Sequence, residues 1–136
     1  MPCHARFEWF MPDVSASLFD QLGGEMAIMA AADLLYAKLV NDSVTRPFFD
    51  GIDMAAQSRK LVGFMAWALG GPEQYRGRPL RDAHAKLVAE QGLSDVHFDA
   101  VAKHLENTLL ELGYDPSLVE QVLGCIASLR SEVLGR

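Results

Sequence analysis

From residue 17 onward, apolar residues recur every three or four positions, which is the period of an amphipathic α-helix. Residues 25–41 place Ile28, Ala32, Leu35 and Leu39 on one face. The same period predicts further helices over about 53–69, over 80–91, after Ser94 and from Pro116, the last with a stripe that ends at Val133. No stretch alternates apolar and polar residues as a half-exposed strand does. The pattern therefore predicts an all-α domain.

Capping and breaking residues mark the ends of these helices. The expected N-caps are Ser17, Asp53, Ser94 or Asp95, and Asp115. Gly23-Gly24 closes a short first helix, and the prolines and glycines of 70–79 predict a loop. A short turn is expected around Pro47 and the pair Phe48-Phe49.

Residues 1–16 differ from the rest, since two prolines and the aromatic cluster Phe7, Trp9 and Phe10 show neither helical nor strand periodicity. We expect an N-terminal extension that is flexible, with packing of its aromatic side chains onto the domain as the alternative. The segment lacks the apolar core of a secretion signal. The predicted domains are thus the extension 1–16 and a helical domain 17–136.

Composition narrows the function classes. The chain has 136 residues, 12 basic against 18 acidic, and a net charge of −6, enough for one domain with a real core. Nucleic acid is not expected as a main partner because phosphate binding requires a basic face. No apolar run is long enough for a membrane span. Two distant cysteines, Cys3 and Cys125, form no C-x-x-C motif, so a cytoplasmic setting is expected.

Familiar catalytic motifs are absent: there is no phosphate-binding glycine loop, no H-E-x-x-H and no G-x-S-x-G. The domain is therefore a binding module or a cofactor holder. His84 is the foremost candidate ligand, because Leu80, Leu87 and Val88 surround it at helical spacing and a metal or haem iron in an apolar pocket needs one neutral imidazole. A core histidine bonded to a carbonyl is the alternative.

A second candidate group follows Asp53. Gln57, Lys60 and Leu61 share one helix face with Phe64, so a polar start leads into an apolar stripe. This pattern suggests a cavity that needs a hydrogen-bond donor, although Gln57 and Lys60 at a helix start also reach water. Tyr36 lies on an apolar face, and its hydroxyl needs a partner.

Taken together, the motifs resemble the group I truncated haemoglobins. The matching motifs are L-G-G at 22–24, L-L-Y at 34–36, F-F-D-G-I-D-M at 48–54, Q-S-R-K at 57–60, G-G-P-E-Q-Y-R-G-R-P-L-R-D-A-H at 70–84 and H-F-D-A-V at 97–101. The resemblance covers residues 17–136 in matching order. It implies a truncated globin, a two-over-two helical sandwich around a b-type haem.

The resemblance also implies roles for residues. His84 would be the proximal iron ligand, and Tyr36 and Gln57 the distal pair that hydrogen-bonds O2. The residues implied to line the pocket or contact the haem are Phe48, Phe49, Leu61, Phe64, Leu80 and Phe98, with Tyr75, Arg78 and Arg81 near its propionates. Lys60 would stand at the cavity mouth, where it would either meet a propionate or swing in to bind iron when neutral.

Three positions depart from the family pattern. Leu61 stands where many relatives carry glutamine, so bound O2 should be restrained less. Met65 occupies a position where relatives often carry a phenylalanine that gates an apolar tunnel. Leu129 lies near the position where some members carry a histidine that bonds covalently to haem. The last departure, without a C-x-x-C-H motif, implies non-covalent haem.

The implied function is binding of O2, NO and CO by a monomeric haem protein that detoxifies nitric oxide to nitrate, a dioxygenase needing an external reductase. A Lys60-ligated redox, electron-transfer or gas-sensing globin is the alternative. A haem-free helical interaction module is a third class. His97 and His104, seven residues apart on one helix, are a further candidate metal site, with capping of the helix by His97 as the alternative.

Overall fold

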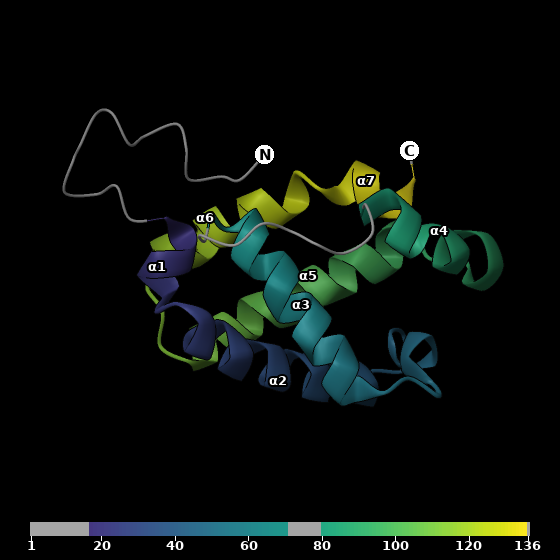
Figure 1. The fold of residues 1–136 in the computed structure, drawn as a ribbon, viewed down its shortest axis with the longest axis horizontal. Helices are drawn as coiled ribbons and strands as arrows, with labels where there is room; N and C mark the ends of the chain where they lie inside the picture. The colour runs from purple at the N-terminus through teal and green to yellow at the C-terminus, as the bar shows by residue number, and fades with distance from the viewer. Residues whose placement is uncertain (1–16, 71–79, 136) are drawn as a thin grey trace.

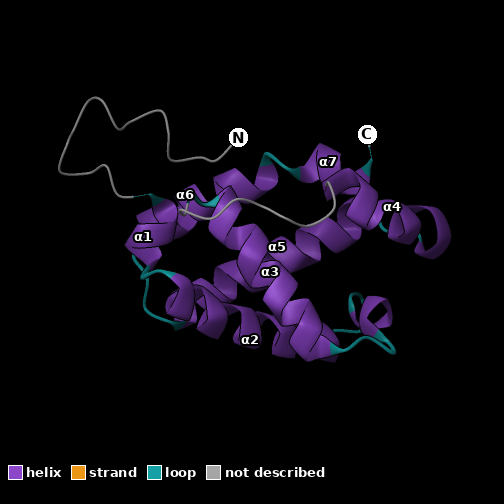
Figure 2. Cartoon of the chain, viewed as in Figure 1, coloured by secondary structure: helices purple, strands orange, loops and turns teal. Residues whose placement is uncertain are grey.

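The computed structural model describes residues 17–70 and 80–135, and within these ranges it contains helices and no strand (Figure 2). The helices are α1 (Leu18–Leu22), α2 (Glu25–Asn41), the 3-10 helix η3 (Arg46–Phe49), α3 (Met54–Ala68), α4 (Leu80–Gln91), α5 (Asp95–Glu111), α6 (Pro116–Ala127) and α7 (Arg130–Leu134). The all-α prediction is confirmed. The predicted extension 1–16 and most of the predicted loop 70–79 lie outside the described residues.

The predicted caps are in place. The Ser17 hydroxyl accepts the N–H of Asp20 at 3.1 Å, and Gly23 ends α1 with φ 115°. The Asp53 carboxylate accepts two N–H groups at the start of α3, at 3.1 and 3.3 Å. Asp115 caps α6 in the same way, at 2.8 Å. These side chains satisfy the amide groups that the first turn of a helix leaves without intrahelical partners.

The core forms where two helix pairs meet. α2 packs against α3 and against α5, and α5 packs against α6, so that α2 joins the two pairs (Figure 1). The expected face of α2 is buried in full, and α5 and α6 contribute side chains with almost no exposure, among them Leu109 and Val122. α1 closes one end, where the Phe19 N–H donates to the carbonyl of Leu69 at 2.9 Å.

The last helix differs from the prediction of one helix as far as Val133. α6 ends at Ala127 and α7 begins at Arg130. The Ser128 hydroxyl donates to the carbonyl of Cys125 at 2.5 Å, and the Leu129 N–H bonds to Ile126 at 3.0 Å, three residues back. A serine hydroxyl that occupies a helix carbonyl competes with the regular ladder, so the helix tightens and restarts in a new direction.

Candidate functional site

Tyr36 and Gln57 come together, as the sequence predicts for a polar pair. Tyr36 lies on the buried face of α2 and is 9% exposed. Burial raises the pKa of its phenol, and a hydrogen bond with Gln57 opposes part of that rise. Phe49 meets the Tyr36 ring edge-on with centroids 5.6 Å apart. The phenol is thus a neutral donor between an aromatic ring and an amide, in surroundings of low dielectric.

Gln57 owes its position to the cap of α3. The Gln57 N–H donates to the backbone carbonyl of Asp53 at 3.0 Å, in the first turn of the helix. Because Asp53 fixes where that turn begins, it also fixes which face of α3 carries the amide. The half-buried Gln57 therefore reaches α2 rather than pointing only to water.

A second aromatic contact joins η3 to α5. The Phe48 ring meets the His97 ring edge-on at 4.7 Å, and Phe98, the next residue on α5, is buried. The His97 ring accepts the N–H of Ser94 through Nδ1 at 3.0 Å, so His97 caps the start of α5. The capping alternative for His97 is confirmed. Aromatic residues predicted to line a pocket thus come from both η3 and α5.

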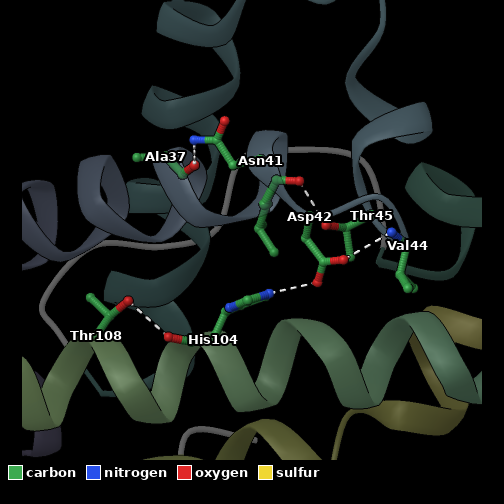
Figure 3. Close-up of polar contacts among 8 residues, drawn as sticks. Ala37, Asn41, Asp42, Val44, Thr45, His104 and Thr108 are labelled. Atoms are coloured by element: carbon green, nitrogen blue, oxygen red, sulfur yellow. Dashed lines mark hydrogen bonds and ion pairs between the residues drawn. The ribbon is translucent and has the colours of Figure 1, made fainter.

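The turn that carries η3 is tied to α5 by a polar cluster (Figure 3). His104 Nε2 lies 2.7 Å from the Asp42 carboxylate, whose other oxygen accepts the Val44 N–H at 2.9 Å. The Thr45 hydroxyl donates to the carbonyl of Leu39 at 2.7 Å. The hydrogen bond from His104, more than any other cause, lowers the pKa of Asp42.

His97 and His104 therefore have separate partners, and the described residues hold no group of three or more histidine, cysteine and acidic side chains that could bind a metal ion. The remote possibility of a metal site on this helix has no support. The Asp42–His104 contact was not predictable from local patterns, because these residues lie 62 positions apart.

His84 is half-buried on α4, the helix that the sequence predicts for it. α4 lies against α7 at the end of the molecule where η3 and the first turn of α5 also lie (Figure 1). The predicted proximal and distal residues stand on separate elements, with His84 on α4, Tyr36 on α2 and Gln57 on α3.

The other predicted residues lie at the surface, beside cavities, or outside the described part of the chain. The Lys60 side chain is exposed and makes no ion pair with a described residue. Leu61 and Met65 line an apolar cavity of about 20 Å³ among α2, α3, α5 and α6. A larger, open groove of about 300 Å³ between α2 and the start of α3 is lined in part by Tyr36. Tyr75 and Arg78 lie outside the described residues, as does the side chain of Leu80, the first residue of α4.

Arg130 is a residue that sequence reasoning missed. Its guanidinium lies 4.4 Å from the centre of the Phe98 ring and binds two carboxylates of α5, those of Asp95 and Asp99. The spacing of Asp95 and Asp99, one helical turn apart, was the available signal for a cation between them.

Comparison with known proteins decides the family. The model of the bacterial-like globin family matches residues 17–134. The group 1 truncated haemoglobin LI410 of Chlamydomonas moewusii is 44% identical over 118 residues, which cover 87% of this chain and 68% of that protein. The chain belongs to the group 1 truncated haemoglobins.

Other relatives agree with this family. The group 1 truncated haemoglobin GlbN of Synechocystis is 39% identical over 107 residues, 79% of this chain and 86% of that one. The 2/2 haemoglobin of Synechococcus sp. PCC 7002, solved with covalently attached haem, superposes with a TM-score of 0.85 at 40% identity, covering 89% of this chain and 100% of that one. The truncated-globin prediction is confirmed.

Globin membership implies haem as cofactor and gas ligands such as O2. The side chains fit that group. Four predicted pocket residues are only half-buried in the protein alone, namely Phe48, Phe49, Leu61 and Phe64. Complete burial of such a side chain, relative to full exposure, stabilises a protein by about 1.5–3 kcal/mol. Incompletely covered aromatic and aliphatic side chains, together with a half-buried histidine on α4, suit a flat apolar macrocycle with one nitrogen ligand. Among the described residues, no helix is long and apolar enough to cross a membrane.

Proposed function

We propose that this truncated haemoglobin binds O2 at haem held by His84 and uses it to convert nitric oxide to nitrate. The observation that carries the proposal is the buried Tyr36 phenol, hydrogen-bonded to Gln57 and packed against Phe49. A buried phenol beside a half-buried amide suits a small polar ligand in an otherwise apolar pocket.

Haem held by His84 would supply a ferrous iron to which O2 binds, and the overall reaction balances as ferrous iron, one O2 and one NO giving ferric iron and one nitrate. An external reductase must return one electron to the iron for each turnover. The protein's part is to bind and orient O2, to keep bulk water out, and to leave room for NO to reach it.

Tyr36 would orient the ligand by donating its hydroxyl proton, while Gln57 holds the phenol in one rotamer. The raised pKa of Tyr36 keeps this donor neutral well above physiological pH. A donor fixed before the ligand arrives needs little reorganisation, so negative charge on the ligand is stabilised at small entropic cost. CO, which develops less negative charge, should depend less on Tyr36.

The other predicted residues would hold the haem itself. His84 would supply the proximal nitrogen, with Phe48, Phe49, Leu61, Phe64, Leu80 and Phe98 packing on the macrocycle. Lys60, Tyr75 and Arg78 would meet the propionates. Leu129 has no group able to form a bond to a vinyl, which supports haem b held without a covalent link.

One observation favours a second function, in which Lys60 closes the sixth coordination site of a redox or gas-sensing globin. The exposed Lys60 side chain has no ion-pair partner among the described residues, so no ion pair opposes its movement toward the iron. Replacing Lys60 by Ala should abolish a low-spin spectrum in the ligand-free protein if this function is right. A spectrum unchanged by Lys60→Ala excludes lysine ligation.

The dioxygenase function is tested by mixing the O2-loaded ferrous protein with one equivalent of NO in a stopped-flow spectrometer and assaying nitrate. We expect one nitrate per haem, with ferric protein formed much faster than O2 dissociates. Turnover should continue when an electron donor reduces the ferric form. Conversion at the rate of O2 dissociation, or without nitrate, would overturn the proposal in favour of simple ligand replacement.

A further inference from the structure

Helix α4, which carries His84, rests on the short helix α7. Among the described residues, α7 is the principal packing partner of α4, and the two lie side by side near the C-terminus (Figure 1). α7 has only five residues, and a break at Ser128 and Leu129 separates it from α6. A helix this short has little stability of its own, so its position must come from its tertiary contacts.

Arg130, the first residue of α7, ties this helix to α5 by ion pairs and a cation–π contact. One guanidinium nitrogen lies 2.9 Å from Asp95 and the other 2.6 Å from Asp99, so the fork spans one turn of α5. The same group stacks 4.4 Å above the ring of Phe98, between the two carboxylates in sequence. The hydrogen bond with Asp99, followed by that with Asp95, raises the pKa of Arg130.

A further ion pair joins α7 to α4. Glu132, two residues after Arg130, accepts from the Arg81 guanidinium at 3.3 Å. Arg81 lies three residues before His84, on the preceding turn of α4. The buried Leu134 adds apolar packing at the end of α7. A continuous path of contacts therefore runs from α5 through Arg130, α7 and Glu132 to the helix of His84.

We propose that Arg130 is a positioning residue for His84: by clamping α7 to α5 over Phe98, it sets where α4 presents its imidazole. The inference rests on the proposed role of His84 as iron ligand. Because the guanidinium also contacts Phe98, the single side chain of Arg130 aligns both a predicted pocket residue and α7, the helix on which α4 rests. A lysine cannot reproduce this geometry, since it offers a point charge rather than a planar fork.

Amide hydrogen exchange of the haem-free protein tests the mechanical part of this proposal without using the iron. Arg130→Met keeps most of the side-chain length and removes both ion pairs and the cation–π contact. We expect amides of α4 and α7 to exchange about tenfold faster, because exposed ion pairs and such stacking each contribute modestly to local stability. Amides of α2 should change little.

Lys38→Met is the matched control, because Lys38 also binds α5, through Glu111 at 2.7 Å, but far from α4. It should leave exchange in α4 unchanged. Equal acceleration in all helices of Arg130→Met, or none in α4, would overturn the proposal. If Arg130→Met does not fold, Asp99→Asn neutralises only the carboxylate of the shortest contact, and selective acceleration in α4 is again required.

The iron–histidine stretching band of the ferrous protein tests whether the contacts of Arg130 affect the position of His84. We expect Arg130→Met to shift or broaden this band and Arg130→Lys to restore it in part, whereas Lys38→Met leaves it unchanged. An unchanged band in Arg130→Met refutes positioning of His84. If the iron–histidine band persists in a His84→Gly variant, His84 is not the iron ligand. The hydrogen-exchange experiment does not depend on that outcome.

Discussion

Removing the hydroxyl of Tyr36 should speed the release of O2. The phenol is 9% exposed, and its raised pKa shows that it stays neutral and able to donate. A hydrogen bond to a ligand that bears negative charge is worth about 1.5–3 kcal/mol, or roughly 10- to 150-fold in rate when it is lost on the way to the unbound state. Tyr36→Phe also leaves the amide of Gln57 without this partner, which further weakens the polar contacts that would hold O2.

The assay is the O2 dissociation rate, measured by replacement with CO in the haem-loaded protein. Tyr114→Phe is the matched control, because the Tyr114 hydroxyl donates instead to the carbonyl of Leu22, at the other end of the fold. Tyr36→Phe should raise the rate at least about tenfold and Tyr114→Phe should not. Equal rates in wild type and Tyr36→Phe would refute the reasoning that the buried phenol restrains O2.

Three further outcomes follow from the same contacts. Leu61→Gln should slow O2 dissociation by roughly 2- to 12-fold, the worth of one neutral hydrogen bond, and an unchanged rate would contradict the idea that Leu61 shortens the distal network. Asp53→Ala should lower the free energy of unfolding by about 0.5–2 kcal/mol in denaturant titrations and speed O2 release, because the first turn that positions Gln57 loses its cap. Asp42→Asn should destabilise the protein at neutral pH. Because His104 lowers the pKa of Asp42 below its ordinary 3.8, the wild-type advantage should persist above that pH and shrink as the pH falls further, and a pH-independent difference in unfolding midpoint would refute this.

Local signals made most of the fold predictable. Asp53 and Asp115 each stand where an apolar period begins, and both cap a helix as expected. Gly23 closes α1 in the left-handed conformation that glycine tolerates best. The division between α6 and α7 was not predictable, because Leu129 and Val133 continue the apolar period while the side chain of Ser128 interrupts the backbone ladder.

The site was predictable only in part, because periodicity assigns residues to faces and does not say which distant faces meet. Tyr36 and Gln57 lay on the correct faces, but their hydrogen bond depends on how α2 crosses α3. The contacts of Asp42 with His104 and of Arg130 with α5 join residues more than thirty positions apart. In the sequence these polar side chains resemble ordinary surface residues, and only the tertiary structure shows that they meet and become partly buried.

The absorption spectrum of the haem-loaded protein, ferric and ferrous, beside that of a His84→Gly variant, tests the central claim most directly. The account predicts a strong Soret band in the wild type, a changed band in the variant, and recovery of the wild-type spectrum when imidazole is added. Spectra that are the same with and without His84, or a wild-type protein with no stable haem band, would contradict it.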